Sequence, residues 1–127
     1  MKVIYRISDA GYKKEKPEYI NNEGCLKNAV EIFPTANNHW LVLADNISEE
    51  TSMMIQKYIP KEYIEHISVG HGAGTFNLAL DKALQFADQE TVYFIENDYL
   101  HRVNSGKVIE EGLDLGASFV SLYDHPD

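Results

Sequence analysis

Residues 40–44, Trp-Leu-Val-Leu-Ala, decide the fold class of this chain. They form an almost continuous apolar run of strand length, which ends abruptly in Asp45 and Asn46. A run without polar alternation is typical of a strand in a parallel sheet, because helices cover both faces of such a sheet. A second run of this kind, residues 91–95, stops just as abruptly at Glu96. We therefore expect both segments to be strands of an α/β fold.

Strand and helix signals alternate on both sides of these runs. Residues 22–33 have apolar side chains at helical spacing and are stopped by Pro34, and Ser48 is a typical N-cap for a helix that reaches Pro60. Thr75 opens a third helix, whose apolar stripe consists of Phe76, Ala79, Leu80, Ala83, Leu84 and Ala87. The other expected elements are strands over residues 3–7, 63–69 and 119–123 and a helix over residues 108–113. This order predicts one domain, residues 1–127, built as a three-layer α/β/α sandwich with a mainly parallel, Rossmann-like sheet.

The composition fits a folded domain and excludes several classes of function. Of the 127 residues, 44% are hydrophobic, which is enough to bury a core. Twenty acidic residues against eleven Lys and Arg give a net charge of −9, so the surface would repel a phosphate backbone and we expect no nucleic-acid partner. No apolar run approaches the ~20 residues of a membrane span, and the N-terminus has no signal-peptide pattern. Because Cys25 is the only cysteine, we expect a cytoplasmic protein that uses this residue as a small buried hydrophobe.

Three of the expected strands run directly into polar residues. The first ends in Ser8-Asp9, the second in Asp45-Asn46 and the fourth in Glu96-Asn97-Asp98. Ligands of open parallel sheets bind beyond the carboxyl ends of the strands, and the middle of a sheet brings several such ends together. The sequence therefore predicts a cleft of nucleotide size at this edge.

Glu96 and Asp98 are the most informative pair. If the strand continues through them, both side chains point the same way, because residues two apart in a strand share a face. Two carboxylates would give Mg²⁺ or Mn²⁺ hard oxygen ligands and leave the other coordination positions to water and phosphate oxygens. Such a metal would act as a Lewis acid on a leaving diphosphate. The alternative is a hydrophilic strand end that faces solvent.

Residues 70–74, Gly-His-Gly-Ala-Gly, allow two interpretations. They lie between an expected strand and an expected helix, and Glu96 follows at about the distance of a ribose-binding acid in a dinucleotide (NAD) fold. The third glycine comes one residue too early for that fingerprint, however. A tight turn, in which small residues let helix and strand pack closely, accounts for the pattern better.

Two further residues have open roles. Arg6, inside the first expected strand, either pairs with a carboxylate near the cleft or points outward from an edge strand. His101 lies three residues beyond Asp98 and could approach a metal or substrate, although a loop histidine is more often a bystander.

The order of the elements and two segments resemble family 2-like glycosyltransferases of the GT-A fold. The segments are residues 43–51, Leu-Ala-Asp-Asn-Ile-Ser-Glu-Glu-Thr, and residues 93–101, Tyr-Phe-Ile-Glu-Asn-Asp-Tyr-Leu-His. The resemblance spans nearly the whole chain and corresponds to the family's nucleotide-binding half. It implies binding of a nucleotide-diphospho-sugar, with UDP favoured, through Mn²⁺ or Mg²⁺.

The resemblance also implies roles for residues. Asp45, with Asn46 beside it, corresponds to the acid that recognises the base, and the turn Arg6-Ile7-Ser8 contributes further base contacts. Glu96-Asn97-Asp98 corresponds to the D-x-D motif: Asp98 is the usual metal ligand, and Glu96 and Asn97 contact the ribose or metal-bound water, with Glu96 as the second acidic residue at the metal. Residues 72–80, which begin with Gly72, are similar to the helix start beneath the diphosphate.

The sequence departs from the family in two ways. Glu96 replaces the first Asp of D-x-D, which keeps the charge and lengthens the side chain. The family's acceptor-binding half, with the catalytic base of inverting members, would lie beyond residue 127, so we expect a truncated chain and assign no catalytic base. The sequence thus predicts a metal-dependent glycosyltransferase, or its donor-binding half, acting on an unspecified saccharide or other acceptor. The alternatives are a non-catalytic nucleotide-binding module and an NAD-dependent enzyme.

Overall fold

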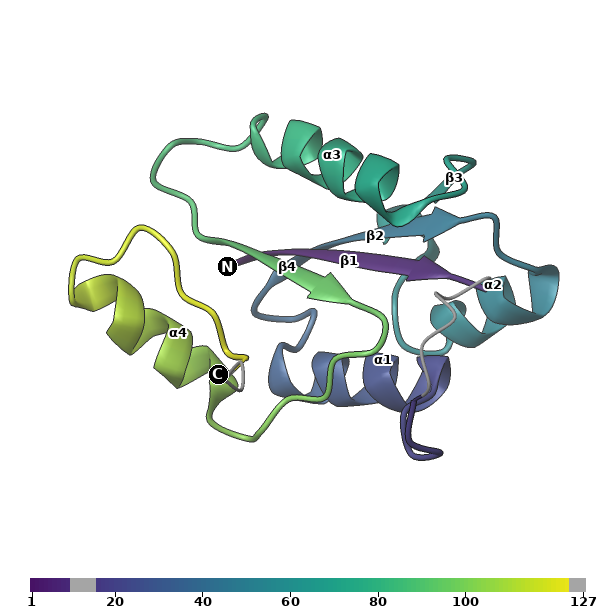
Figure 1. Ribbon diagram of the computed structural model, residues 1–127, viewed down its shortest axis with the longest axis horizontal. Coiled ribbons are helices and arrows are strands. Elements are labelled where there is room, and N and C mark those ends of the chain that lie inside the picture. Colours follow the sequence, from purple (N-terminus) through teal and green to yellow (C-terminus); the bar gives the residue numbers. More distant parts are fainter. Residues whose placement is uncertain (10–15, 124–127) are drawn as a thin grey trace.

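The computed structural model describes residues 1–9 and 16–123, which form a parallel sheet with helices on both faces (Figure 1). The strands are β1 (Lys2–Ser8), β2 (His39–Asp45), β3 (Ile64–Ile67) and β4 (Val92–Glu96). The helices are α1 (Asn22–Ile32), α2 (Glu49–Gln56), α3 (Gly72–Ala83) and α4 (Ser105–Asp114), with a short 3₁₀ helix, η1 (Lys61–Tyr63), before β3. The expected α/β class with a parallel sheet is confirmed.

The strand order is β3-β2-β1-β4, so β1 lies between β2 and β4. The register pairs Ser8 with Asp45 and Arg6 with Glu96. It therefore brings the polar ends of three strands together at the carboxyl edge of the sheet. The chain builds outward from β1 to β2 and β3, then crosses back to β4 on the other side, so the strand order reverses at β1. β4 is an edge strand, and only Ile95 of its five residues is buried.

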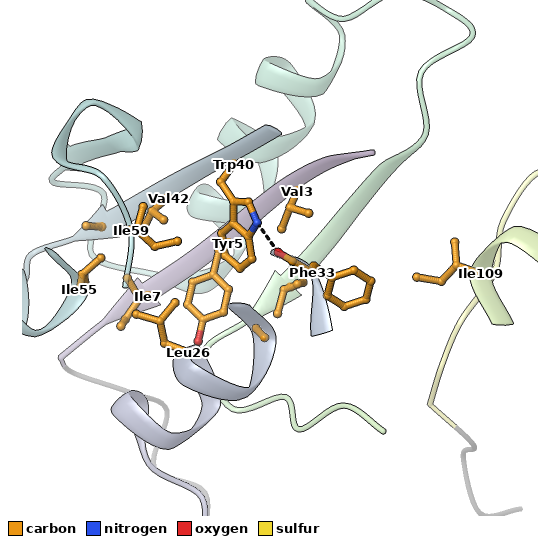
Figure 2. Packing of buried hydrophobic residues seen from close by; sticks show 13 residues of the cluster. Val3, Tyr5, Ile7, Leu26, Phe33, Trp40, Val42, Ile55, Ile59 and Ile109 are labelled. Atoms are coloured by element: carbon orange, nitrogen blue, oxygen red, sulfur yellow. Dashed lines mark hydrogen bonds between the residues drawn. The ribbon is translucent and has the colours of Figure 1, made fainter. Parts of the chain in front are cut away.

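The larger core lies between the sheet and α1, α2 and α4 (Figure 2). Alternate residues of β1 point to this face, as the two-residue period of a strand requires. Trp40 is buried here and its Nε1 donates a hydrogen bond to the Phe33 carbonyl oxygen over 2.8 Å, which satisfies the polar atom of this large side chain. Cys25 is buried, as expected. The cluster consists of Val3, Tyr5, Ile7, Leu26, Ala29, Phe33, Trp40, Val42, Ala44, Ile55, Ile59, Ile95 and Ile109.

Helix α3 covers the opposite face of the sheet, where Ile4, Leu43 and Ala79 form a smaller core. The helix buries Thr75 and Ala79, whereas Phe76, Leu80 and Leu84, in the predicted apolar stripe, are 40%, 39% and 82% exposed. The prediction was right for Ala79 and Ala83, which pack on the smaller core, and wrong for the larger side chains, because the buried face of the helix is rotated away from them. Because Thr75 and Ala79 are small, the helix can approach the sheet closely. The Thr75 hydroxyl can be buried because it donates a hydrogen bond to the Gly72 carbonyl oxygen (3.0 Å).

The expectation of a fifth strand over residues 119–123 was wrong. Within the described part of the chain β4 pairs with β1 alone, and the segment after α4 turns back beside that helix (Figure 1). Val120 lies against Gly112, where an added Cβ would be 2.7 Å from the Val120 Cγ2 atom, and Leu122 packs against the larger core. Phe119 is 92% exposed. Some of the apolar side chains that suggested a strand are thus buried against α4 and the core. Composition cannot distinguish a segment that is buried in this way from one that pairs with a neighbouring strand.

Candidate functional site

A pocket of about 130 Å³ lies at the carboxyl edge of the sheet, next to the reversal of strand order. It is formed by the ends of β1, β2 and β4, the turn after β3 and the first turn of α3. Every site residue predicted from the sequence lines it: Arg6, Ser8, Asp45, Asn46, Gly72, Glu96, Asn97 and Asp98. Ile7, Leu43, Gly70, His71 and Thr75 complete the lining. Pockets for drug-sized ligands measure roughly 300–1,000 Å³, so this one would enclose only part of a sugar nucleotide.

Arg6 connects three of the elements that surround the pocket. One guanidinium nitrogen, Nη2, forms an ion pair with Oε1 of Glu96, and Nη1 donates hydrogen bonds to the Gly72 carbonyl oxygen (3.1 Å) and the Thr75 hydroxyl (3.2 Å). The guanidinium carbon also lies 5.2 Å from the centre of the Phe76 ring. Arg6 therefore pairs with a carboxylate at the cleft, which was the first of its two predicted roles. The second, an outward side chain on an edge strand, was wrong because β1 is central.

Asp45 is only 4% exposed and binds the turn that follows β3. Its Oδ1 accepts a hydrogen bond from the backbone N–H of Val69 (2.7 Å), and its Oδ2 accepts one from that of Gly70 (2.9 Å). Gly70 has φ = +87°, a conformation that favours glycine. Next to Asp45, the Asn46 Oδ1 atom accepts a hydrogen bond from the Ser68 hydroxyl (2.8 Å). Asp45 thus has a structural function: it holds the turn after β3 against the end of β2.

The premise that β4 continues through the acidic motif was wrong. The strand ends at Glu96, and Asn97 and Asp98 lie in a turn closed by a hydrogen bond from the Tyr99 N–H to the Glu96 carbonyl oxygen (3.1 Å). The turn nevertheless directs all three residues of the motif to the pocket. The side chain of Asp98 is 27% exposed, and its Oδ2 is 3.4 Å from Nζ of Lys16. We refer to residues 96–98 as the acidic turn.

The carboxylates of the acidic turn have the chemistry of a site for a hard divalent cation. Arg6 occupies Oε1 of Glu96 and Lys16 lies near Oδ2 of Asp98, which leaves the second oxygen of each carboxylate as a potential ligand. Over residues 1–9 and 16–123 no group of three His, Cys, Asp or Glu side chains converges. Water and the bound ligand would have to fill the remaining positions. Mg²⁺ fits that description, since it commonly keeps several waters and binds one or two carboxylates together with substrate phosphates.

The charges at the pocket also indicate a cation. Three carboxylates, from Asp45, Glu96 and Asp98, line the pocket, and the positive charges beside them are the guanidinium of Arg6 and Nζ of Lys16, 3.4 Å from Asp98. A diphosphate would be repelled by this excess of negative charge unless a cation accompanied it.

Sequence reasoning missed His71, which begins α3 as its N-cap. The Nδ1 atom of His71 accepts a hydrogen bond from the Gly74 N–H over 3.0 Å, and this cap lets the helix start at Gly72 rather than at Thr75 as predicted. Histidine is not among the preferred N-cap residues, so only its place between strand and helix could have indicated this role. The glycines pack closely, as the second interpretation expected: a Cβ on Gly74 would be 2.5 Å from Cγ1 of Val69.

His101 does not line the pocket. Its Nε2 forms a hydrogen bond of 2.6 Å with the Tyr93 hydroxyl, and its ring packs edge-on against Phe33, with centroids 5.3 Å apart. Burial lowers the pKa of His101 from 6.5 to about 4, so the ring is neutral at pH 7. Its contacts are those of a structural residue.

Comparisons with protein-family models, with curated proteins and with solved structures found no match for this chain. Among the described residues, no helix has both the length and the apolar character needed to cross a membrane. Function must therefore be inferred from the pocket itself.

Proposed function

We propose that this protein is a metal-dependent glycosyltransferase, or the donor-binding half of one, and that it binds a nucleotide-diphospho-sugar, with UDP as the favoured nucleotide. The proposal is carried by one observation: eight residues chosen from separate stretches of the sequence surround a single pocket. The pocket lies where open parallel sheets bind nucleotides, beyond the carboxyl ends of the strands and next to a reversal of strand order.

In this proposal each wall of the pocket contacts a different part of the donor. Asp98, assisted by Glu96, holds Mn²⁺ or Mg²⁺, which when bound neutralises negative charge on the diphosphate. Glu96 and Asn97 contact the ribose or metal-bound water. The ends of β1 and β2 read the base through Arg6, Ser8, Asp45 and Asn46. The first turn of α3, from Gly72, lies beneath the diphosphate, where backbone N–H groups and the helix dipole favour an anion.

The negative charge of the pocket favours this reading over NAD binding. A dinucleotide site relies on a glycine-rich turn and a helix N-terminus to hold the pyrophosphate without a metal. Here the corresponding turn lines the same pocket as three carboxylates, which would oppose a pyrophosphate that arrives without a cation. A non-catalytic nucleotide-binding module would use the same metal and differ only in lacking transfer.

The first test is thermal unfolding of the purified chain with UDP, GDP, CDP or NAD, each with Mn²⁺ or with EDTA. A ligand that binds only the folded chain stabilises it by about 2.7 kcal/mol at a hundred times its Kd, which raises the melting temperature by several degrees. We expect a rise with one nucleoside diphosphate, UDP, and only with Mn²⁺. A rise with NAD in EDTA would instead identify a dinucleotide site.

The decisive variant is Asp98→Asn, which removes the charge of the proposed metal ligand with little change in shape. It should abolish the Mn²⁺-dependent rise and leave the melting temperature of the free protein within about 1–2 °C, because its pair with Lys16 is partly exposed. Asp88→Asn is the matched control, since Asp88 is exposed in the loop between α3 and β4. An unchanged Mn²⁺-dependent rise in Asp98→Asn would refute the assignment. Release of UDP from a UDP-sugar in the presence of acceptor would separate an enzyme from a binding module.

A further inference from the structure

We infer that α1 positions the acidic turn through two asparagines, Asn22 and Asn28, and that His101 is the residue through which Asn28 acts. The inference rests on the proposed function, because it assigns to these residues the task of placing Asp98 for a metal. Neither asparagine was selected from the sequence, and His101 was considered there only as a residue that could approach the metal or substrate directly. We call Asn22, Asn28 and His101, together with the Tyr93 hydroxyl, the α1 anchor.

Asn22 links two walls of the pocket. The side-chain amide of Asn97, in the acidic turn, donates a hydrogen bond of 2.6 Å to Oδ1 of Asn22. The amide nitrogen of Asn22 in turn donates a long hydrogen bond, 3.5 Å, to the carbonyl oxygen of Ser8 at the end of β1. The first residue of α1 therefore ties the acidic turn to the central strand.

Asn28 holds the chain just beyond the acidic turn by both of its polar atoms. Its Oδ1 accepts a hydrogen bond from the backbone N–H of His101 (2.7 Å), and its Nδ2 donates one to the carbonyl oxygen of His101 (3.0 Å). Two hydrogen bonds of opposite direction to one residue restrict both the position and the rotation of the backbone. One side chain thus joins segments 73 residues apart in the sequence.

The His101 ring completes the anchor. Besides its hydrogen bond to the Tyr93 hydroxyl (2.6 Å), the ring is almost perpendicular to Phe33 (88°) and to Tyr93 (86°). Only Tyr99 and Leu100 separate it from Asp98. The acidic turn is therefore held by β4 on one side and by the α1 anchor on the other.

Asp98 depends on this anchor because it lies in a turn, where no strand ladder positions its backbone. A carboxylate binds a metal well only when surrounding groups hold its orientation, and loss of a group bonded directly to the ligand typically weakens metal binding 10–100-fold. The anchor holds the backbone next to Asp98 rather than its carboxylate, so we expect a smaller effect. Among the described residues the anchor makes no hydrogen bond to either carboxylate of the acidic turn. Asn28 acts on the backbone of His101, beyond Asp98, and Asn22 acts on the side chain of Asn97.

The test compares the wild-type chain with Asn28→Ala. We expect the affinity for Mn²⁺ in the presence of UDP, measured by calorimetric titration, to fall by roughly 2–30-fold, the effect of about 0.5–2 kcal/mol that is usual for residues without contact to the ligand, while any affinity for UDP in EDTA stays unchanged. Backbone amides of residues 97–101 should exchange hydrogen faster, while those of β1 remain protected. Asn38→Ala is the matched control: its amide also binds a backbone carbonyl, that of Pro34 (3.1 Å), but it precedes β2 at the opposite edge of the sheet.

A second variant, Tyr93→Phe, removes only the hydroxyl that binds the His101 ring, and it serves if Asn28→Ala does not fold. It should weaken Mn²⁺ binding in the same direction and to a smaller extent. Unchanged Mn²⁺ affinity, or unchanged exchange at residues 97–101, in a folded variant of either kind would overturn the inference while the proposed function stands. A wild-type chain without Mn²⁺-dependent nucleotide binding would remove the proposed function, and with it the metal-site role of the anchor.

Discussion

At the scale of single residues, the charged side chains of the pocket also hold the fold together. Arg6 joins β1, β4 and α3 through Glu96, Gly72 and Thr75. Asp45 satisfies two backbone N–H groups of the turn after β3 while it is almost fully buried. Substituting either residue would change ligand contacts and local structure at once, because a buried polar group that loses its partner costs about 1–3 kcal/mol. Asp98, whose contacts are partly exposed, is the cleaner probe of binding.

Also at this scale, we predict that stability falls as the pH decreases from about 6.5 to 4 because of His101. Burial lowers the pKa of its ring to about 4, so in this window the unfolded chain binds a proton that the folded chain excludes. Acid therefore favours unfolding, with a slope of at most about 1.4 kcal/mol per pH unit, reduced because the ring is only partly buried. Urea unfolding at about pH 7, 5.5 and 4.5 measures the slope. His101→Gln should show a smaller loss than the wild type, and equal slopes would contradict the prediction.

At the scale of elements, the junction between β3 and α3 shows how closely the site is packed. Gly74 lies in the first turn of α3, with Val69 and the His71 cap directly against it. An added Cβ would be 2.5 Å from Cγ1 of Val69 and 2.6 Å from Cε1 of His71. Val69 is β-branched and can adjust little. The glycine therefore allows the helix N-terminus to sit against the end of β3.

We predict opposite effects of alanine at two glycines in helix first turns. Alanine is favoured over glycine in a helix by about 1 kcal/mol, and at Gly106, the second residue of α4, a Cβ would make an ordinary contact of 3.5 Å with Phe33. Gly106→Ala should therefore raise the free energy of unfolding by about 0.5–1 kcal/mol. At Gly74 the clash outweighs the propensity, and Gly74→Ala should lower it by about 1–3 kcal/mol. Urea unfolding measures the free energy of unfolding of both variants. As a control, adding Val69→Ala to Gly74→Ala should restore part of the lost stability, because it removes the clashing side chain. A Gly74→Ala single variant more stable than the wild type would contradict the prediction.

At the scale of the whole molecule, one core joins most of the secondary structure. Residues of β1, β2, β4, α1, α2 and α4 meet in a single buried cluster around Trp40 and Tyr5, whose rings are 5.8 Å apart. β1, β2 and β4 could not lose their packing without exposing this cluster. We therefore expect the chain to unfold as one unit, as single domains of this size usually do.

The prediction at this scale uses Trp40, the one tryptophan of the chain. The ring is 1% exposed in the shared core, so its fluorescence should shift to longer wavelength only when the core opens. The urea transition followed by this fluorescence should coincide with that followed by far-ultraviolet circular dichroism. Separate midpoints would contradict the prediction, because they would mean that the helices and the core unfold independently. Trp40→Phe is the control: it keeps an aromatic ring in the core and removes the indole, so its dichroism signal shows the transition without any contribution from tryptophan.

Local patterns were sufficient to predict the four strands and four helices that the structure contains and the polar residues at the strand ends, but they also predicted a fifth strand that is absent from the described residues. The apolar runs that became β1, β2 and β4, the Ser48 cap of α2 and the stop at Pro34 depend on neighbouring residues alone. The polar strand ends could be read for the same reason, and the general rule for parallel sheets placed them at one edge.

Contacts between distant residues decided the rest. The partners of Arg6 and Asp45, the buried face of α3, the packing of Leu122 against the larger core and the anchoring of His101 by Asn28 all join residues far apart in the chain. Periodicity along a sequence reports which side chains avoid water, not which surface covers them. The sequence by itself thus determined the α/β class and the candidate site residues, whereas only the tertiary structure decided their partners and orientations, because those depend on which elements meet in space.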